Sequence, residues 1–267
     1  PGRSEAMESV LIYTYDYESE GGLELKKAIT KHTGKDVAWC EKGDYIHVAN
    51  KGTIICWGKI AGPPNKVPFS TRILNSWHGN HIKVNKLRAF EAMDSALVAT
   101  VPFTTSLGNA TSWLAQGHTV VCRHKVGSQD SKGIEVVVPT KTFLGRNKLD
   151  LPSCKLYTQY IPHAREFRVH CTQLYFIDGL EKKKLPTGNP HIFHQDHGLF
   201  CRDGVIIPQV AINAAKQAVQ ACGLDFGAVD LLWKDQKPYI LEVNTAPGLL
   251  ASEANNYAKA FSKHGYV

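Results

Sequence analysis

The chain has 267 residues, of which 43% are hydrophobic and 21% are charged, a balance typical of globular proteins. No apolar run approaches the roughly 20 residues of a membrane-spanning helix, and the first apolar stretch is too short for a signal peptide, so neither is expected. Residues 1–6 resemble a cloning remnant that precedes a native start at Met7. The seven cysteines include no Cys-x-x-Cys pair, which disfavours a disulfide framework or a cysteine zinc site and favours a cytoplasmic location.

The formal net charge of +7 admits two interpretations. One is nucleic-acid binding, and the other is an enzyme that uses Lys and Arg to hold nucleotide triphosphates and acidic substrates. The sequence has no dense basic run beyond Lys182–Lys184. Charge alone therefore does not separate the two classes.

The pattern of the first third predicts a small α/β lobe over residues 7–80. Runs rich in β-branched and aromatic residues predict strands at 10–15, 45–48 and 53–57. A helix is predicted from Leu23 to about His32, where Gly34 ends it. The Pro- and Gly-containing segment 58–79 is expected to close this lobe.

The rest of the chain is expected to form two α+β lobes, at residues 81–150 and 151–267. Apolar residues at helical spacing and the capping and stop signals predict helices at 84–97, from near Asn109, at 209–222 and at 251–264. Alternating or β-branched runs predict strands at 119–124, 134–138, 156–161, 166–171, 174–177, 228–233 and 239–244.

The last two predicted strands carry the most informative pattern. Alternation places Glu242 and Asn244 on one face of their strand and the intervening apolar residues on the other. A three-residue loop at 235–237, or a five-residue loop, would place Asp230 opposite Glu242, whereas an even-numbered loop without a bulge would separate the two acids. Adjacent carboxylates repel, and hard divalent cations relieve that repulsion, so this patch is a candidate Mg²⁺ site. The alternative is a pair of strands with polar faces toward solvent.

Two segments of this hairpin, Asp225–Asp230 and Ile240–Leu249, strongly resemble the metal-binding end of ATP-grasp ligases. The run from Glu242 to Gly248 is similar to D-alanine–D-alanine ligases and ribosomal-protein glutamate ligases. Over residues 10–260 the chain most resembles phage-encoded ATP-grasp carboxylate–amine ligases. The resemblance implies an ATP-grasp fold of mixed α/β and α+β class, in which a small N-terminal α/β lobe precedes two α+β lobes that clasp ATP.

The resemblance also assigns metal and nucleotide contacts to particular residues. Asp230, Glu242 and Asn244 would hold two Mg²⁺ ions, with Glu242 bridging them. The residues implied in nucleotide binding are Lys86 and Arg123 on the phosphates, Gly127, Ser128 and Gly133 in a phosphate loop, Gln159, Tyr160 and Ile161 along the adenine edge, and Leu241 on the adenine face. Taken alone, a lysine on an amphipathic helix or a glycine-containing loop is usually a plain surface feature.

A second group of polar residues lies in the predicted strand at 166–171. Alternation places Glu166, Arg168 and His170 on one face, and the strand resembles the Glu-x-Arg-Val-His motif of the phage-type ligases. By that resemblance Arg168 would stabilise the transferring phosphoryl group or the acyl phosphate, and Glu166 would contribute to cofactor binding. Lys182 and Lys184 share a strand face, and one of them would meet phosphate or substrate. Arg168, Lys184 and Glu242 are therefore the expected catalytic residues.

The segment 191–198 departs from the phage-type motif Ile-Arg-Asn-His-x-Asn-Gly. This segment would lie near the triphosphate and the acceptor, so the identity of the substrate stays open. The three-residue spacing of His191, His194 and His197 also admits a zinc site as an alternative.

These observations predict a ligase in which a substrate carboxylate attacks the γ-phosphorus of ATP and an amine then displaces phosphate from the acyl phosphate. The expected cofactors are ATP and two Mg²⁺ ions, and the expected partners are a carboxylate and an amine, with a nucleic acid or a protein as a possible acceptor. Glu166 and His194 are candidate general bases. The alternatives are an ATP-grasp phosphotransferase and a nucleic-acid-associated protein that has lost catalysis. The phage resemblance implies the cytoplasm of an infected host.

Overall fold

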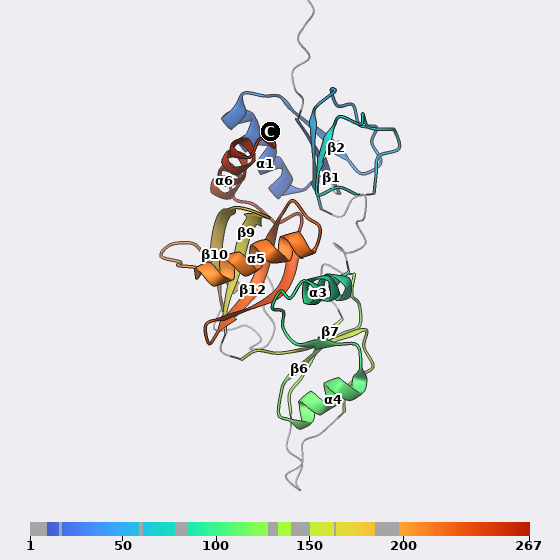
Figure 1. Ribbon diagram of the computed structural model, residues 1–267, viewed down its shortest axis with the longest axis vertical. Coiled ribbons are helices and arrows are strands. Elements are labelled where there is room, and N and C mark those ends of the chain that lie inside the picture. Colours follow the sequence, from blue (N-terminus) through green and yellow to red (C-terminus); the bar gives the residue numbers. More distant parts are fainter. Residues whose placement is uncertain are drawn as a thin grey trace, which may run out of the picture.

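The computed structural model describes residues 10–15, 18–58, 61–77, 85–127, 133–139, 150–162, 164–184 and 198–267. In these residues the chain forms one parallel and two antiparallel sheets, which follow one another along the long axis of the molecule (Figure 1). Within the same residues, no helix combines the length and the apolar character that crossing a bilayer requires.

The first lobe is a parallel sheet with the strand order β2-β1-β3-β4. Its strands are β1 (Val10–Thr14), β2 (Val37–Glu41), β3 (Thr53–Trp57) and β4 (Arg72–Leu74). Every residue of β1 and β3 is buried, as expected of a parallel sheet that is covered on both faces. Helix α1 (Glu20–Thr33) ends at Gly34, whose φ of 70° is costly for residues with a Cβ atom.

The strand predicted at 45–48 is wrong, and the sheet instead contains β2 at Val37–Glu41. After α1 the chain returns directly to pair with β1, with Val37 opposite Val10. Ile46 is buried, but its backbone N–H and C=O bond to the side chain of Asn65 at 2.8 and 2.6 Å rather than to a neighbouring strand. The apolar residues at 45–48 therefore belong to a loop that packs on the core.

The second lobe combines two short helices with an antiparallel sheet in the order β5-β8-β6-β7. The helices are α3 (Lys86–Ser95) and α4 (Leu107–Ala115), and the strands are β5 (Phe103–Thr104), β6 (Val120–Arg123), β7 (Ile134–Val137) and β8 (Leu156–Gln159). The side chains of Asn85 and Ser106 accept hydrogen bonds from the first turns of α3 and α4, which explains where both helices begin. Because β8 pairs with β6, this lobe extends past the boundary expected at residue 150.

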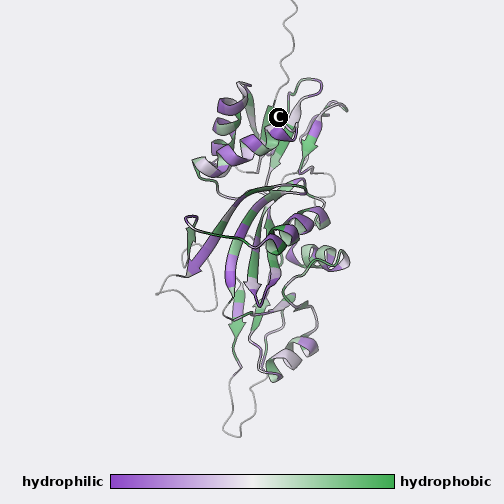
Figure 2. Ribbon diagram, turned by 60° about the vertical axis from the view of Figure 1, so that its left-hand side comes forward, coloured by the Kyte–Doolittle hydropathy of each residue, from purple (hydrophilic) through white to green (hydrophobic). Residues whose placement is uncertain are grey.

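The third lobe is a five-stranded antiparallel sheet in the order β11-β10-β9-β12-β13. Its strands are β9 (Arg165–Thr172), β10 (Phe176–Lys184), β11 (Gly198–Cys201), β12 (Phe226–Lys234) and β13 (Lys237–Asn244). The strand predicted at 174–177 begins too early, because residues 173–175 form the turn between β9 and β10. Hydrophobic and hydrophilic residues follow one another along these strands (Figure 2), as expected of a sheet with one face on the core and one polar face.

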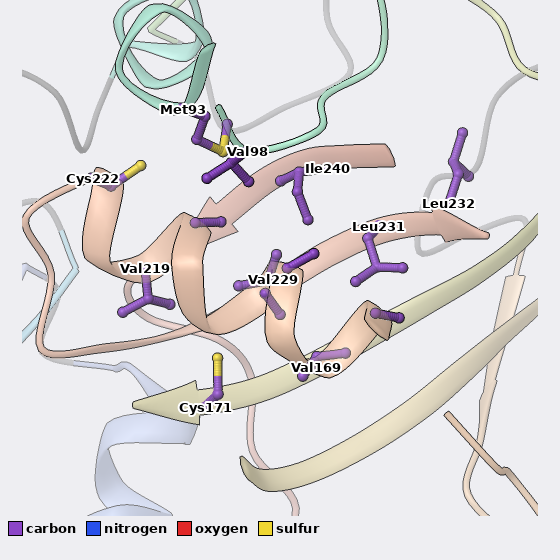
Figure 3. Packing of buried hydrophobic residues seen from close by; sticks show 14 of the residues in the cluster. Met93, Val98, Val169, Cys171, Val219, Cys222, Val229, Leu231, Leu232 and Ile240 are labelled. Atoms are coloured by element: carbon purple, nitrogen blue, oxygen red, sulfur yellow. The ribbon is translucent and has the colours of Figure 1, made fainter. Parts of the chain in front are cut away.

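Helix α5 (Gln209–Ala221) covers the apolar face of this sheet. Val219 on the helix and Cys222 just after it share one core with Val169, Cys171 and Val229, all of which are labelled in Figure 3. Met93 and Val98 from the second lobe pack against Ile240 in the same core (Figure 3). The largest core among the described residues therefore joins the second and third lobes, and α5 leaves the opposite, polar face of the large sheet uncovered.

The C-terminal helix α6 (Ala251–Lys263) packs on α1 of the first lobe, although its sequence follows the third lobe (Figure 1). Tyr257 and Phe261 share a hydrophobic cluster with Trp57 and Phe226. The indole of Trp57 stacks on the ring of Phe226 at a centroid distance of 5.8 Å. The first lobe is thus completed by residues from the end of the described chain.

A hydrogen-bonded interlock at Asn75 ties the first lobe to the large sheet. The Asn75 side chain is buried, accepts from the backbone N–H of Asp225 at 2.8 Å and donates to the C=O of Phe226 at 3.0 Å. In return, the Asp225 carboxylate accepts from the Asn75 backbone N–H at 2.6 Å. Asn75 has a φ of 51°, a region that Asn adopts more readily than most residues.

We expect Asn75→Ala to lower the free energy of unfolding by roughly 2–4 kcal/mol, because it removes the partners of the part-buried N–H of Asp225 and the buried C=O of Phe226. Asn109→Ala, at an exposed position of α4, is the matched control and should change stability by less than about 0.5 kcal/mol. Urea unfolding followed by circular dichroism measures both. Equal midpoints for the two variants would show that the interlock contributes nothing.

Candidate active site

The β12–β13 hairpin brings two carboxylates together through a β-bulge. Its turn contains two residues, Asp235 and Gln236, whose φ values of 50° and 60° suit the tight turns of hairpins. The predicted three-residue loop is therefore wrong, and a two-residue loop alone would place the acids on opposite faces. The pairing shifts between Asp230 and Leu231, so that Leu241 is an extra residue in β13 and Asp230 lies opposite Glu242 as predicted.

The two carboxylates and the amide of Asn244 form one polar patch. The Asn244 amide donates to a Glu242 oxygen at 3.0 Å and lies 3.5 Å from an Asp230 oxygen. Burial disfavours the charge on Glu242, but Lys86, Asn244 and Arg123 together outweigh it and lower the pKa of Glu242 to about 2. Glu242 is therefore ionised at neutral pH.

Three cations from three elements surround these acids. Lys86, the first residue of α3, forms an ion pair with Glu242. Arg168 on β9 lies opposite Asp230 and donates to it in a bidentate pair from Nε and Nη2, both at 2.7 Å. Burial disfavours the charge on Arg168, but Asp230 holds its pKa above the usual value.

Arg123 on β6 is the third cation of the group. Burial lowers its pKa, and the charge of Glu242 opposes that effect. Its Nε is buried and has no hydrogen-bond partner among the described residues. A buried donor without a partner is costly, so Arg123 is suited to an anionic ligand that accepts from it.

Glu166 and Lys182 form a second, more deeply buried pair on the same face of the sheet. They lie opposite each other on β9 and β10, with 3.4 Å between ammonium and carboxylate. Burial is the main reason that the pKa of Glu166 is raised to about 7, and Lys182 opposes that rise. Lys184 ends β10, and its side chain lies outside the described residues.

The donor set of the patch fits Mg²⁺. Asp230, Glu242 and the amide oxygen of Asn244 are hard oxygen ligands, and which way an amide group points is an assignment that a half-turn reverses. Among the residues that the structure describes, no three His, Cys, Asp or Glu side chains form a metal cluster. Mg²⁺ with few carboxylates takes phosphate oxygens as further ligands, and three cationic side chains lie beside this patch.

The structure describes some of the remaining predicted residues. Gly133, with a φ of 83°, ends the loop after β6, while Ser128 and the histidines at 191, 194 and 197 lie outside the described residues. The backbone N–H groups of Gln159 and Tyr160 donate to Pro102 and Thr119 at 2.9 Å. An adenine edge at this strand would therefore have to use other groups, such as those of Ile161. Leu241 is partly buried against the main core.

Two further residues of this face have no role in the predicted site. The ring of Phe200 lies 4.6 Å from the guanidinium carbon of Arg168, and no motif marks it. His170 was placed on this face without a role, and it is fully buried with Nδ1 3.0 Å from the Tyr257 hydroxyl. Burial, with Arg168 and Arg202 nearby, lowers the pKa of His170 to about 3, so it is neutral.

The pKa of Glu166 predicts how stability depends on pH. Folding raises this pKa from about 4.3 to about 7, so the folded state favours the protonated carboxyl of Glu166. The contribution of this group to stability is therefore fully present below pH 4 and is lost as the pH rises to 7. The unfolding free energy of the wild type minus that of Glu166→Gln should fall by roughly 2–4 kcal/mol between pH 4.5 and 8. Glu181→Gln, on the neighbouring strand, is the control without this decline. Parallel stability curves for wild type and Glu166→Gln would contradict the shift.

The whole chain is similar to several solved structures. Neither the protein-family models nor the curated proteins contain a match to the sequence. The D-alanine–D-alanine ligase from Bacillus anthracis superposes with a TM-score of 0.62 at 12% identity, covering 98% of this chain and 99% of that one. The ATP-grasp ligase PsnB, complexed with a phosphomimetic variant of its minimal precursor, Mg and ADP, gives a TM-score of 0.67 at 8% identity and covers 96% and 99%.

The macrocyclase MdnB from Microcystis aeruginosa gives a TM-score of 0.59 at 14% identity, with 95% of this chain and 98% of that chain covered. All three likenesses extend over nearly the whole of both chains, at identities that speak for the fold alone. Together with the three-sheet architecture, they show that this chain has the ATP-grasp fold.

Proposed function

We propose that the protein is an ATP-dependent carboxylate–amine ligase that works through an acyl phosphate. The observation that carries the proposal is the convergence of Lys86, Arg123 and Arg168 on the Asp230–Glu242 pair in an ATP-grasp fold. Two of the similar solved structures are named as ligases and the third as a macrocyclase, and PsnB is crystallised with Mg and ADP, which supports ATP and Mg²⁺ as cofactors here.

In the first step an oxygen of the substrate carboxylate attacks the γ-phosphorus of ATP, the bond to the bridging oxygen breaks, and ADP leaves. Arg168 and Lys86 would bind the oxygens of the transferring group, and Arg123 has a buried N–H to offer. Asp230, Glu242 and Asn244 would hold Mg²⁺, whose charge offsets that of the phosphates. In this proposal the protein supplies position and charge, and no side chain acts as a nucleophile.

In the second step an amine attacks the acyl carbon, the C–O bond to phosphate breaks, and the amine loses a proton. Glu166 is the described carboxylate on this face whose pKa, raised to about 7, suits proton transfer near neutral pH. We propose an amino acid or a peptide as the source of amine or carboxylate, since PsnB is complexed with a precursor peptide.

The ligase reaction is tested with Mg-ATP and a pool of amino acids, small peptides and polyamines, with ADP, phosphate and amide product measured together. Glu242→Gln should lower turnover at least roughly 100-fold, as the loss of a group that stabilises the transition state does. Glu181→Gln removes a carboxylate that pairs with Arg165 on the other face of the sheet, and it should stay within about twofold of wild type. A stable phosphorylated product without free phosphate would contradict a ligase and favour a phosphotransferase.

The role of Arg168 is tested against Arg165, three residues earlier on the same strand. Lysine cannot reproduce a two-pronged guanidinium contact, so Arg168→Lys should lower kcat by roughly 10²–10³ with little change in KM for ATP. Arg165→Lys loses the bidentate pair between Glu181 and Arg165, whose side chain is half exposed. The kcat of this variant should be close to that of wild type. Equal losses in both variants would show that strand β9 as a whole, rather than Arg168, is required.

A further inference from the structure

Phe200 reaches across the large sheet to cover two cations of the polar face. It lies on β11, opposite Lys182 on β10. The centroid of its ring lies 4.6 Å from the guanidinium carbon of Arg168, which is on β9, and 5.7 Å from the ammonium nitrogen of Lys182. Cations within about 6 Å of an aromatic face are attracted to its π-electrons, more strongly where water is excluded. The Arg168 and Lys182 side chains are only 13% and 7% exposed.

The guanidinium of Arg168 is therefore held in two independent ways. Nε and Nη2, along one edge, bond to Asp230, while the ring of Phe200 lies against the group as a cation–π contact. These contacts leave Nη1 as the nitrogen that can turn to a bound oxyanion. Together they hold a long, flexible side chain in one orientation before any substrate arrives.

The edge contact is conditional, because Asp230 is also one of the proposed Mg²⁺ ligands. A carboxylate oxygen that binds a cation keeps a lone pair for an N–H group, but the charge of the cation weakens the attraction between Asp230 and Arg168. The contact with Phe200 does not compete with metal binding, since a ring carries no ligand atom. It is the contact that can keep Arg168 in place through the reaction.

We infer that Phe200 is a positioning residue, which holds the guanidinium of Arg168 toward the reacting phosphoryl group while Asp230 is engaged elsewhere. The catalytic part of this inference rests on the proposed ligase function. The positional part concerns only the described side chains and is tested without a substrate.

The positional part is tested by NMR of the arginine Nε–H groups, with the Arg168 signal assigned by its loss in Arg168→Lys. Asp230→Asn weakens the edge contact, and the Arg168 signal should persist in it. Adding Phe200→Leu to Asp230→Asn should speed the exchange of this proton with water by roughly 2- to 30-fold, the range expected for a cation–π contact. The double variant that combines Asp230→Asn with Phe200→Tyr should again show slow exchange of this proton.

Arg165 is an internal reference on the same strand, because it pairs with Glu181 and lies 4.7 Å from the ring of Phe167. Its signal should not change in any Phe200 variant. If Phe200→Leu fails to fold, Phe200→Met offers an apolar side chain of similar length and is measured in the same way. Exchange at Arg168 that is equally slow with the phenylalanine in place and after its replacement by leucine or methionine would overturn the inference.

The catalytic part is measured with the substrate that the pooled turnover assay identifies. Phe200→Leu should lower kcat by the same 2- to 30-fold, leave KM for ATP within about twofold, and be rescued by Phe200→Tyr. A stable phosphorylated product without free phosphate, together with the expected NMR result, would contradict the ligase but not the positioning by Phe200. Turnover that is insensitive to Phe200, with the ligase reaction intact, would contradict the positioning role in catalysis.

Discussion

The polar face of the large sheet depends on the opposition of Asp230 and Glu242 across the β12–β13 hairpin. Two carboxylates at this spacing are unfavourable unless cations balance them, and the fold supplies three from elements far apart in sequence. Lys86 arrives on α3, Arg123 on β6 and Arg168 on β9. A site whose acidic and basic side chains come from different lobes exists only when those lobes are assembled, so the charge balance depends on the fold as a whole.

The lobes are joined by different kinds of contact. The first lobe is held to the large sheet by the Asn75 interlock and by the stacking of Trp57 on Phe226. The second lobe meets β13 through backbone hydrogen bonds between Ile240 and residues 99 and 101, and through the ion pair of Lys86 with Glu242. The junction of the second and third lobes is therefore where the charged groups of the site meet, while the first lobe gives the large sheet a fixed support.

Much of this arrangement follows from local sequence patterns. Period-2 alternation identified the face of Glu166, Arg168, Glu242 and Asn244, and helical spacing with caps identified α3, α5 and α6. The bulge at Leu241 could not be predicted, because it arises from the register that β12 must keep with both β9 and β13. The strand at 37–41 was missed because topology, not propensity, selects which apolar run pairs with β1. Phe200 was missed because its partners come from other strands and no spacing records them.

The packing of α6 on α1 has a consequence for the order of events during synthesis. The cluster around Trp57 draws on β1, α1 and β3 from the first 57 residues, and on Phe226, Tyr257 and Phe261 from the last 42. A ribosome exposes the first group long before the second, so the emerging lobe must wait with part of its apolar surface uncovered. Contacts between such distant segments are slow to form. The first of the three lobes to be made is thus completed only after helix α6 has been synthesised.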